Sequence, residues 1–261
     1  MQKRTANKLW LAGVSAAACI AAILGGLSLG YAFDFSIGHF DTRSPLWILT
    51  LVIGWAAALG ALLYPILALR RDNYAPDYKI SPLLDFASLF AAFALVLDAV
   101  MTFLANRTAM DKVLYVRLLL TLIAAGFFVM LFLCRGEKSP LLSILGGGAT
   151  LWATVEAFCA YFNDSVTLVS PFRYFPSIAT VTLAYLLFCE VKHSYKEAKP
   201  LLLILFGAVS GALCLSVGGA TVIAYLFNLN REAIFVTDGL WMVALGIYGL
   251  GRTKQVLFPK K

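Results

Sequence analysis

Residues 82–105, PLLDFASLFAAFALVLDAVMTFLA, and residues 113–134, VLYVRLLLTLIAAGFFVMLFLC, decide the fold class of this chain. Each segment is longer than about 20 mostly apolar residues, the length at which an α-helix crosses the hydrocarbon core of a membrane. A short polar stretch separates the two segments, so together they predict a helical hairpin within a bilayer. One acid, Asp98, and one base, Arg117, interrupt the apolar pattern.

The composition extends this interpretation to the whole chain. Of the 261 residues, 61% are hydrophobic and 13% are charged, and the mean hydropathy is +0.84. Soluble domains carry about 25% charged residues. The sequence therefore predicts an all-α, polytopic membrane protein embedded in a lipid bilayer, with a single transmembrane domain over residues 1–261 and no soluble domain.

Eight apolar segments are expected to cross the membrane as helices. They are predicted over residues 9–33, 46–69, 82–105, 113–134, 140–162, 170–189, 200–227 and 233–250. The second is expected to bend at Pro65, because proline removes a backbone hydrogen-bond donor. The sixth is the least regular, because Arg173 and Pro176 interrupt its start, and seven spans is the alternative.

Positive charge is concentrated on one side of these predicted spans. Most of the 21 Lys and Arg residues lie in segments 1–8, 70–81, 135–138, 191–199 and 252–261. Such clusters stay in the cytoplasm, so we expect both termini to be cytoplasmic in a cell-membrane protein. This explains the net charge of +7 without a nucleic-acid partner. Segments 70–81 and 191–199 are the candidate contacts for a protein partner.

A repeated pattern divides the chain into four predicted hairpin units, roughly residues 9–69, 82–134, 140–190 and 200–250. The last three begin with Pro-Leu-Leu at Pro82, Pro140 and Pro200, about 60 residues apart. Proline is tolerated in the first turn of a helix, where its missing donor costs nothing. We interpret the pattern as an internal repeat whose units surround one site. The alternative is that a membrane of fixed thickness imposes similar lengths.

Four charged residues are expected to form a layer in the outer half of the membrane: Asp98, Glu156, Asp238 and Arg117. Counted along their helices at 1.5 Å per residue, all lie roughly 6–11 Å inside the outer boundary. Charged groups at this depth are costly and commonly functional. Arg173 is a further candidate for the layer. Three acids and one base predict a site for a cation or small polar solute.

A structural interpretation of the same charges stays open, in which Asp98 and Arg117 form an ion pair that locks their hairpin. Two other acids, Asp85 and Glu190, are expected at the cytoplasmic ends of their helices, in reach of water and without function. Helix packing is expected at Gly207, Gly211 and Gly218, because small residues let helices approach closely. The glycines of segment 146–148 are expected to pack or to bend their helix.

Three functions are compatible with these features. The first is a transporter or permease-like protein that binds a cation or a small polar or cationic solute. The alternative is a non-transporting component, such as an accessory subunit, scaffold or sensor, with structural ion pairs. An enzyme acting on lipid through Asp98, Glu156 and Asp238 is the least favoured. The sequence contains no recognisable motif for a metal, a cofactor or a catalytic set, and its two histidines, His39 and His193, lie far apart.

Overall fold

The computed structural model describes residues 2–34, 39–70, 81–108, 111–134, 139–162, 171–195, 197, 199–227, 229 and 233–259. These residues form an all-α bundle of eight long helices. The helices are α1 (Gln2–Tyr31), α2 (Pro45–Tyr64), α3 (Pro82–Asn106), α4 (Lys112–Cys134), α5 (Pro140–Tyr161), α6 (Pro171–Ser194), α7 (Pro200–Leu226) and α8 (Ala233–Leu257). A two-residue strand, β1 (Phe33–Asp34), pairs antiparallel with β2 (His39–Phe40).

Proline positions set several helix starts. Helices α2, α3, α5 and α7 each begin with a proline that follows an extended residue. At α3 the Ser81 hydroxyl also accepts a hydrogen bond from the Leu84 amide, at 3.4 Å. A proline inside the second predicted helix has the opposite effect, since Pro65 ends α2 and begins a π-helical turn, η1 (Pro65–Leu69). The regular α-helix thus ends at the residue where a bend is expected, and the bend itself stays a prediction.

Seven of the eight helices, α1 to α7, are long and apolar enough to cross a membrane. The predicted class, an all-α helical membrane protein, is confirmed. The sixth predicted segment is a complete helix in which residues 174–193 meet this criterion. Helix α8 is not among these seven in the part of the chain that the structure describes, and it extends past the predicted end at Leu250 to Leu257, so that it includes Arg252.

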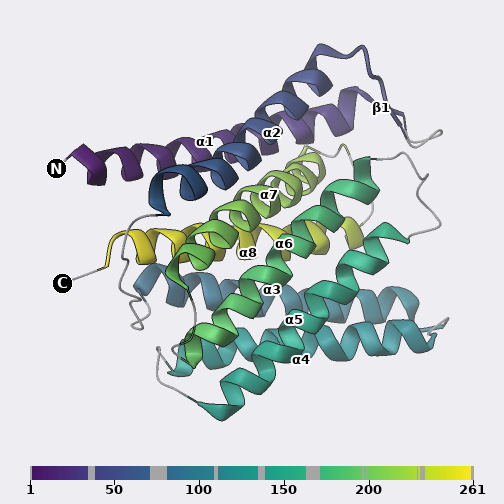
Figure 1. Ribbon diagram of the computed structural model, residues 1–261. Helices are drawn as coiled ribbons and strands as arrows, with labels where there is room; N and C mark the ends of the chain where they lie inside the picture. Colours follow the sequence, from purple (N-terminus) through teal and green to yellow (C-terminus); the bar gives the residue numbers. More distant parts are fainter. Residues whose placement is uncertain are drawn as a thin grey trace.

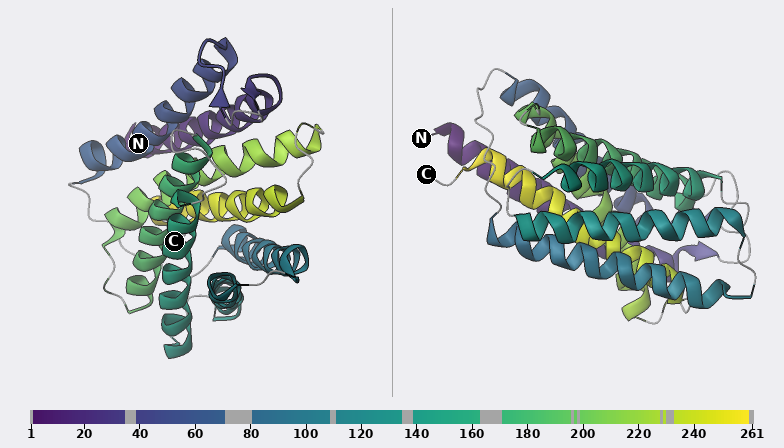
Figure 2. Two further views of the ribbon diagram at one scale, coloured as in Figure 1. Left: turned by 90° about the vertical axis from the view of Figure 1, so that its right-hand side faces the viewer. Right: turned by 90° about the horizontal axis from the view of Figure 1, so that it is seen from below.

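Helices that follow one another in the sequence pack as antiparallel neighbours, except that α2 does not pack against α3 (Figure 1). Six of the helices also close a ring, because α3, α4, α5, α6, α7 and α8 pack in that order and α8 returns to α3. Figure 2 shows α8 between α7 and α3. The pair formed by α1 and α2 lies outside the ring, alongside α7 (Figures 1 and 2). The internal repeat itself stays a prediction.

Both termini lie at the same end of the bundle (Figure 1). This arrangement follows from an even number of helices that alternate in direction. The half of the ring nearer the termini is called the inner half here, and the opposite half the outer half. The cytoplasmic location of the termini stays a prediction.

Small residues bring α7 and α8 into close contact. A Cβ atom on Gly207 would lie 2.6 Å from the Thr253 hydroxyl oxygen, and one on Gly211 would lie 2.9 Å from the Leu250 nitrogen. A Cβ atom on Gly218 would clash with Met242. The three glycines therefore lie on the face of α7 that meets α8, where larger residues do not fit.

The glycines of segment 146–148 lie within α5, which continues as an α-helix through them. A Cβ atom on Gly146 would lie 2.6 Å from Val191 of α6 and 3.0 Å from Phe127 of α4. A Cβ atom on Gly147 would have no heavy atom within 4 Å. Packing against neighbours thus accounts for Gly146, whereas the position of Gly147 is open.

Helix α8 carries polar residues because the bundle encloses it. Arg252, Thr253 and Gln255 are buried, and so are Trp241 and Tyr248. A helix surrounded by protein does not need an apolar surface on every side, since its polar groups find partners on other helices. The place of α8 in the bundle therefore accounts for its buried polar residues.

Candidate functional site

The candidate site lies in the outer half of the ring, where four helices, α3, α4, α5 and α8, bring their charges together. Arg117 of α4 meets Glu156 of α5 through a hydrogen bond from Nε to Oε1 of 2.7 Å. Its Nη2 atom lies 3.7 Å from Oδ1 of Asp238 on α8. One guanidinium therefore joins two acids and links α4 to both α5 and α8.

Asp98 of α3 completes this charged layer but has a different main partner. Its Oδ1 accepts a hydrogen bond of 2.7 Å from the hydroxyl of Thr237 on α8. Its carboxyl also interacts with the neighbouring carboxyl of Asp238. The expected ion pair of Asp98 with Arg117 is not the arrangement seen, because Arg117 points across the ring to Glu156 and Asp238.

The layer is closed on one side and open on another. Asp98 and Glu156 are buried, with exposed fractions of 4% and 5%. The side chain of Asp238 is 34% exposed and that of Arg117 is 24% exposed. Asp238 and Arg117 are therefore the more accessible members of the layer, while Asp98 and Glu156 are enclosed by the surrounding helices.

The charges in the layer do not balance. One guanidinium faces three carboxyl groups, and Glu156 makes the shortest contact with it. Among the described residues, Asp238 shares Arg117 with Glu156, and the adjacent Asp98 has no ion pair within 4 Å. Two neighbouring acids in a low-dielectric site favour a shared proton or a bound cation. The described residues contain no group of three acids, cysteines or histidines placed to hold a metal ion.

Aromatic residues fill the ring beneath the layer. The rings of Trp152 on α5 and Trp241 on α8 meet edge to face, with centroids 5.1 Å apart. The Trp241 indole nitrogen donates to Asp238 at 3.3 Å. Toward the inner half, Phe128 of α4 meets Tyr248 of α8 with centroids 5.3 Å apart. These four residues are called the aromatic plug here. They lie between the charged layer and the inner half of the ring.

A second ion pair, which the sequence analysis missed, lies buried in the inner half of the ring. Arg252 donates from Nε to Oε1 of Glu190 at 2.6 Å and from Nη2 to Oε2 at 2.8 Å. The two side chains are 4% and 2% exposed. The expectation that Glu190 lies in reach of water is therefore wrong. Glu190 lies near the end of α6, and its side chain points to Arg252 of α8.

A signal for this pair was present in the sequence. Tyr248, Arg252 and Gln255 follow one another at helical spacing, and they continue the face that carries Trp241. Residues at spacings of three and four share one face of a helix. Ending the helix at Leu250 placed Arg252 in a basic tail and hid the pattern.

Two expectations fall outside the described part of the chain. The backbone of Arg173 lies in the first turn of α6, but its side chain is not among those described. Of the candidate partner segments, residues 71–80, 196 and 198 are likewise outside the described residues. Residues 191–194 belong to the last turn of α6.

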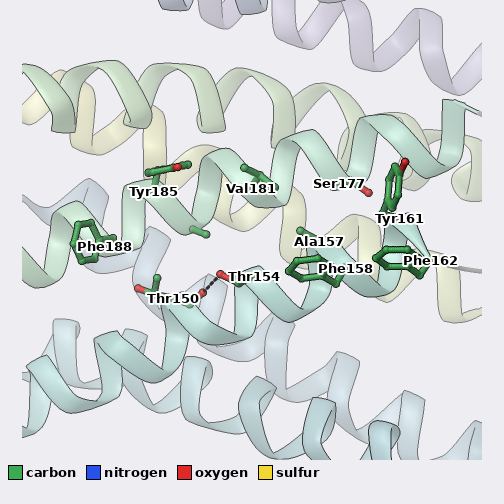
Figure 3. A pocket seen from close by; sticks show the side chains of 11 residues that line it. Thr150, Thr154, Ala157, Phe158, Tyr161, Phe162, Ser177, Val181, Tyr185 and Phe188 are labelled. Carbon is green, nitrogen blue, oxygen red and sulfur yellow. Dashed lines mark hydrogen bonds between the residues drawn. The ribbon is translucent and has the colours of Figure 1, made fainter.

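A groove runs along the outside of the ring between α5 and α6 (Figure 3). Phe158, Phe162, Tyr185 and Phe188 line it, and each is more than a third exposed. The Thr150 and Thr154 hydroxyls in the groove donate to backbone carbonyls of their own helix. The groove is thus an apolar, lipid-facing surface, and it is separate from the charged layer.

Comparison with known proteins adds no family. No protein family, curated protein or solved structure matches this chain. Its function is therefore argued from the geometry of the ring.

Proposed function

We propose that this protein is a membrane transporter that binds a cation, or a small cationic or polar solute, in the charged layer. The observation that supports this most is the pair of adjacent acids, Asp98 and Asp238, beside an Arg117 that is already engaged with Glu156. A buried site with excess negative charge attracts a positive ligand. Intramembrane acids that face a bundle interior commonly mark such pathways.

Each residue has a distinct role in this proposal. Asp238 receives the solute, because it is the most exposed acid of the layer. Asp98 binds it from the buried side, and Thr237 holds the Asp98 carboxyl through its hydroxyl. Arg117 and Glu156 form a fixed ion pair that positions α4 and α5 around the site. Glu156 is thereby a positioning residue, while Asp98 and Asp238 bind.

Flux measurements in proteoliposomes test the proposal. The probes are protons, sodium, potassium and tetraethylammonium, each followed across liposomes that contain the purified protein. Asp98→Asn and Asp238→Asn keep the size of each side chain and remove its charge. We expect both variants to reduce flux of the transported probe at least tenfold.

The matched control is Glu197→Gln, which removes an exposed acid outside the ring. Its flux should equal that of the unaltered protein. Flux that is unchanged in Asp98→Asn and Asp238→Asn, or equal to that of protein-free liposomes for every probe, would contradict the proposal.

A second candidate is a non-transporting membrane component, such as an accessory subunit or scaffold. It is favoured by the two buried ion pairs, Arg117–Glu156 and Arg252–Glu190, which would fix helix positions in a static bundle. This candidate expects a stable complex with another membrane protein after extraction in mild detergent. Recovery of the chain without a partner, together with solute flux, would argue against it.

A further inference from the structure

We propose that the Glu190–Arg252 ion pair is the inner gate of the pathway that begins at the charged layer. This inference rests on the proposed transport function and assigns a role to residues that the function itself does not use. In this structure the gate is closed. It opens when α6 and α8 separate at their inner ends and the two side chains part.

The position of the pair supports this role. Arg252 follows Asp238 by fourteen residues on α8, which corresponds to about 21 Å along the helix axis. The same helix therefore carries a charged site in each half of the ring. A solute that leaves the outer layer along α8 meets this pair before it reaches the inner end of the bundle.

The pair also crosses the ring instead of joining neighbours. Glu190 belongs to α6 and Arg252 to α8, and α7 lies between these helices in the packing order. Both guanidinium contacts are short, and both side chains are nearly fully buried. Tyr248 interacts with the same Glu190 carboxyl, and Gln255 accepts a hydrogen bond from Arg252 at 3.3 Å. Together these side chains occlude the inner half.

The chemistry of the pair suits a closure that has to open. Burying two charges gives little net stability, and apolar residues of similar size stabilise as well or better. When the two side chains part and water enters, however, each charge is hydrated again. The open state therefore does not carry the free-energy cost of exposing an apolar core to water. The aromatic plug formed by Trp152, Trp241, Phe128 and Tyr248 would give a second closure above it.

A cysteine-accessibility experiment tests the gate. The reporter is Leu186→Cys, one turn from Glu190 on the same face of α6 and fully buried, in a background without the native cysteines. The protein is held in lipid nanodiscs, so that a charged thiol reagent reaches both ends of the bundle. Labelling is compared with and without the neutral double substitution Glu190→Gln/Arg252→Gln, which leaves no buried charge unpaired.

We expect the neutral pair to increase the labelling rate at Leu186→Cys at least tenfold. The control reporter is Cys214, kept as the single native cysteine, which is fully buried between α6 and α7. It should stay unlabelled with or without the neutral pair. Faster labelling at both reporters would indicate that the whole bundle is loosened. An unchanged labelling rate at both reporters would show that the ion pair does not seal the inner half. Either result overturns the gate.

The gate and the transport function can fail separately. Normal flux that depends on Asp98, with no change in Leu186→Cys labelling by the neutral pair, would leave transport in place and refute the gate. Faster labelling in a protein without flux for any probe would refute transport instead. As a second variant, Glu190→Cys/Arg252→Cys joined by a short bifunctional thiol reagent should abolish flux, and unlinking it should restore flux.

Discussion

Removing one acid from each of the two buried ion pairs is expected to destabilise the protein by different amounts. Glu190→Gln removes the carboxylate that pairs with Arg252, whose side chain is only 4% exposed and lies beside the neutral Gln255. Removal of one member of a buried pair costs about 3–5 kcal/mol, because the other charge stays buried without compensation. We therefore expect a loss of about 3 kcal/mol or more in the free energy of unfolding.

Glu156→Gln should lower the free energy of unfolding by less, because Arg117 keeps a second acid as its partner and is partly exposed. Asp238 lies 3.7 Å from its Nη2 atom, and the Arg117 side chain is 24% exposed. Partly exposed pairs contribute about 1 kcal/mol or less, so we expect a loss of about 1–2 kcal/mol once the lost 2.7 Å contact with Glu156 is included.

The assay is equilibrium unfolding of the purified variants in mixed detergent and lipid micelles, followed by circular dichroism. Glu190→Gln/Arg252→Gln serves as the companion variant and should recover most of the loss, since it leaves no lone charge. Equal losses in Glu190→Gln and Glu156→Gln would refute the reasoning. So would a loss below about 1 kcal/mol in Glu190→Gln, because a buried charge would then carry no penalty.

Two further predictions concern helix packing and access to the charged layer. Gly211→Ala should destabilise the α7–α8 contact by about 1–3 kcal/mol, since its Cβ would lie 2.9 Å from the Leu250 nitrogen. A Cβ atom at Gly147 would have no heavy atom within 4 Å, so Gly147→Ala should leave the free energy of unfolding unchanged or raise it by about 0.5–1 kcal/mol. A larger loss of stability in Gly147→Ala than in Gly211→Ala would contradict the packing argument. Cysteine at position 238, introduced as Asp238→Cys, should react with a charged thiol reagent faster than Asp98→Cys, because the native side chain is 34% exposed and Asp98 only 4%. Faster labelling of Asp98→Cys would mean that the layer opens on its other side.

The helices were predictable because membrane spans are read mainly from length and polarity. The apolar runs and the prolines at Pro82, Pro140 and Pro200 predicted the starts of α3, α5 and α7 at the residues where they occur. The end of α8 was not predictable in this way, since a helix enclosed by protein tolerates charge. Hydropathy reflects how much of a helix contacts lipid, and α8 makes little contact with lipid.

The charged layer was predictable in depth but not in pairing. Counting residues along each helix placed Asp98, Arg117, Glu156 and Asp238 at a similar height, and the structure connects all four. Partner choice depends on how each helix is rotated and where it stands in the ring. The rotation of each helix about its axis cannot be read from a single sequence. The sequence therefore suggests Asp98 of the same hairpin as the partner of Arg117, and not Glu156 of the next hairpin.

The enclosed position of α8 has a consequence for biosynthesis. A segment that contains Asp238, Arg252 and Lys254 inserts into lipid less readily than an uninterrupted apolar one, because charged residues are costly inside the hydrocarbon core. Its partners are already in place when it is made, since the other five helices of the ring precede it in the chain. Membrane insertion of α8 is then driven by assembly with α3 and α7, and until it arrives the nascent protein carries Asp98 and Glu190 without their α8 partners. This incomplete ring is the folding intermediate that membrane quality-control proteins would encounter first.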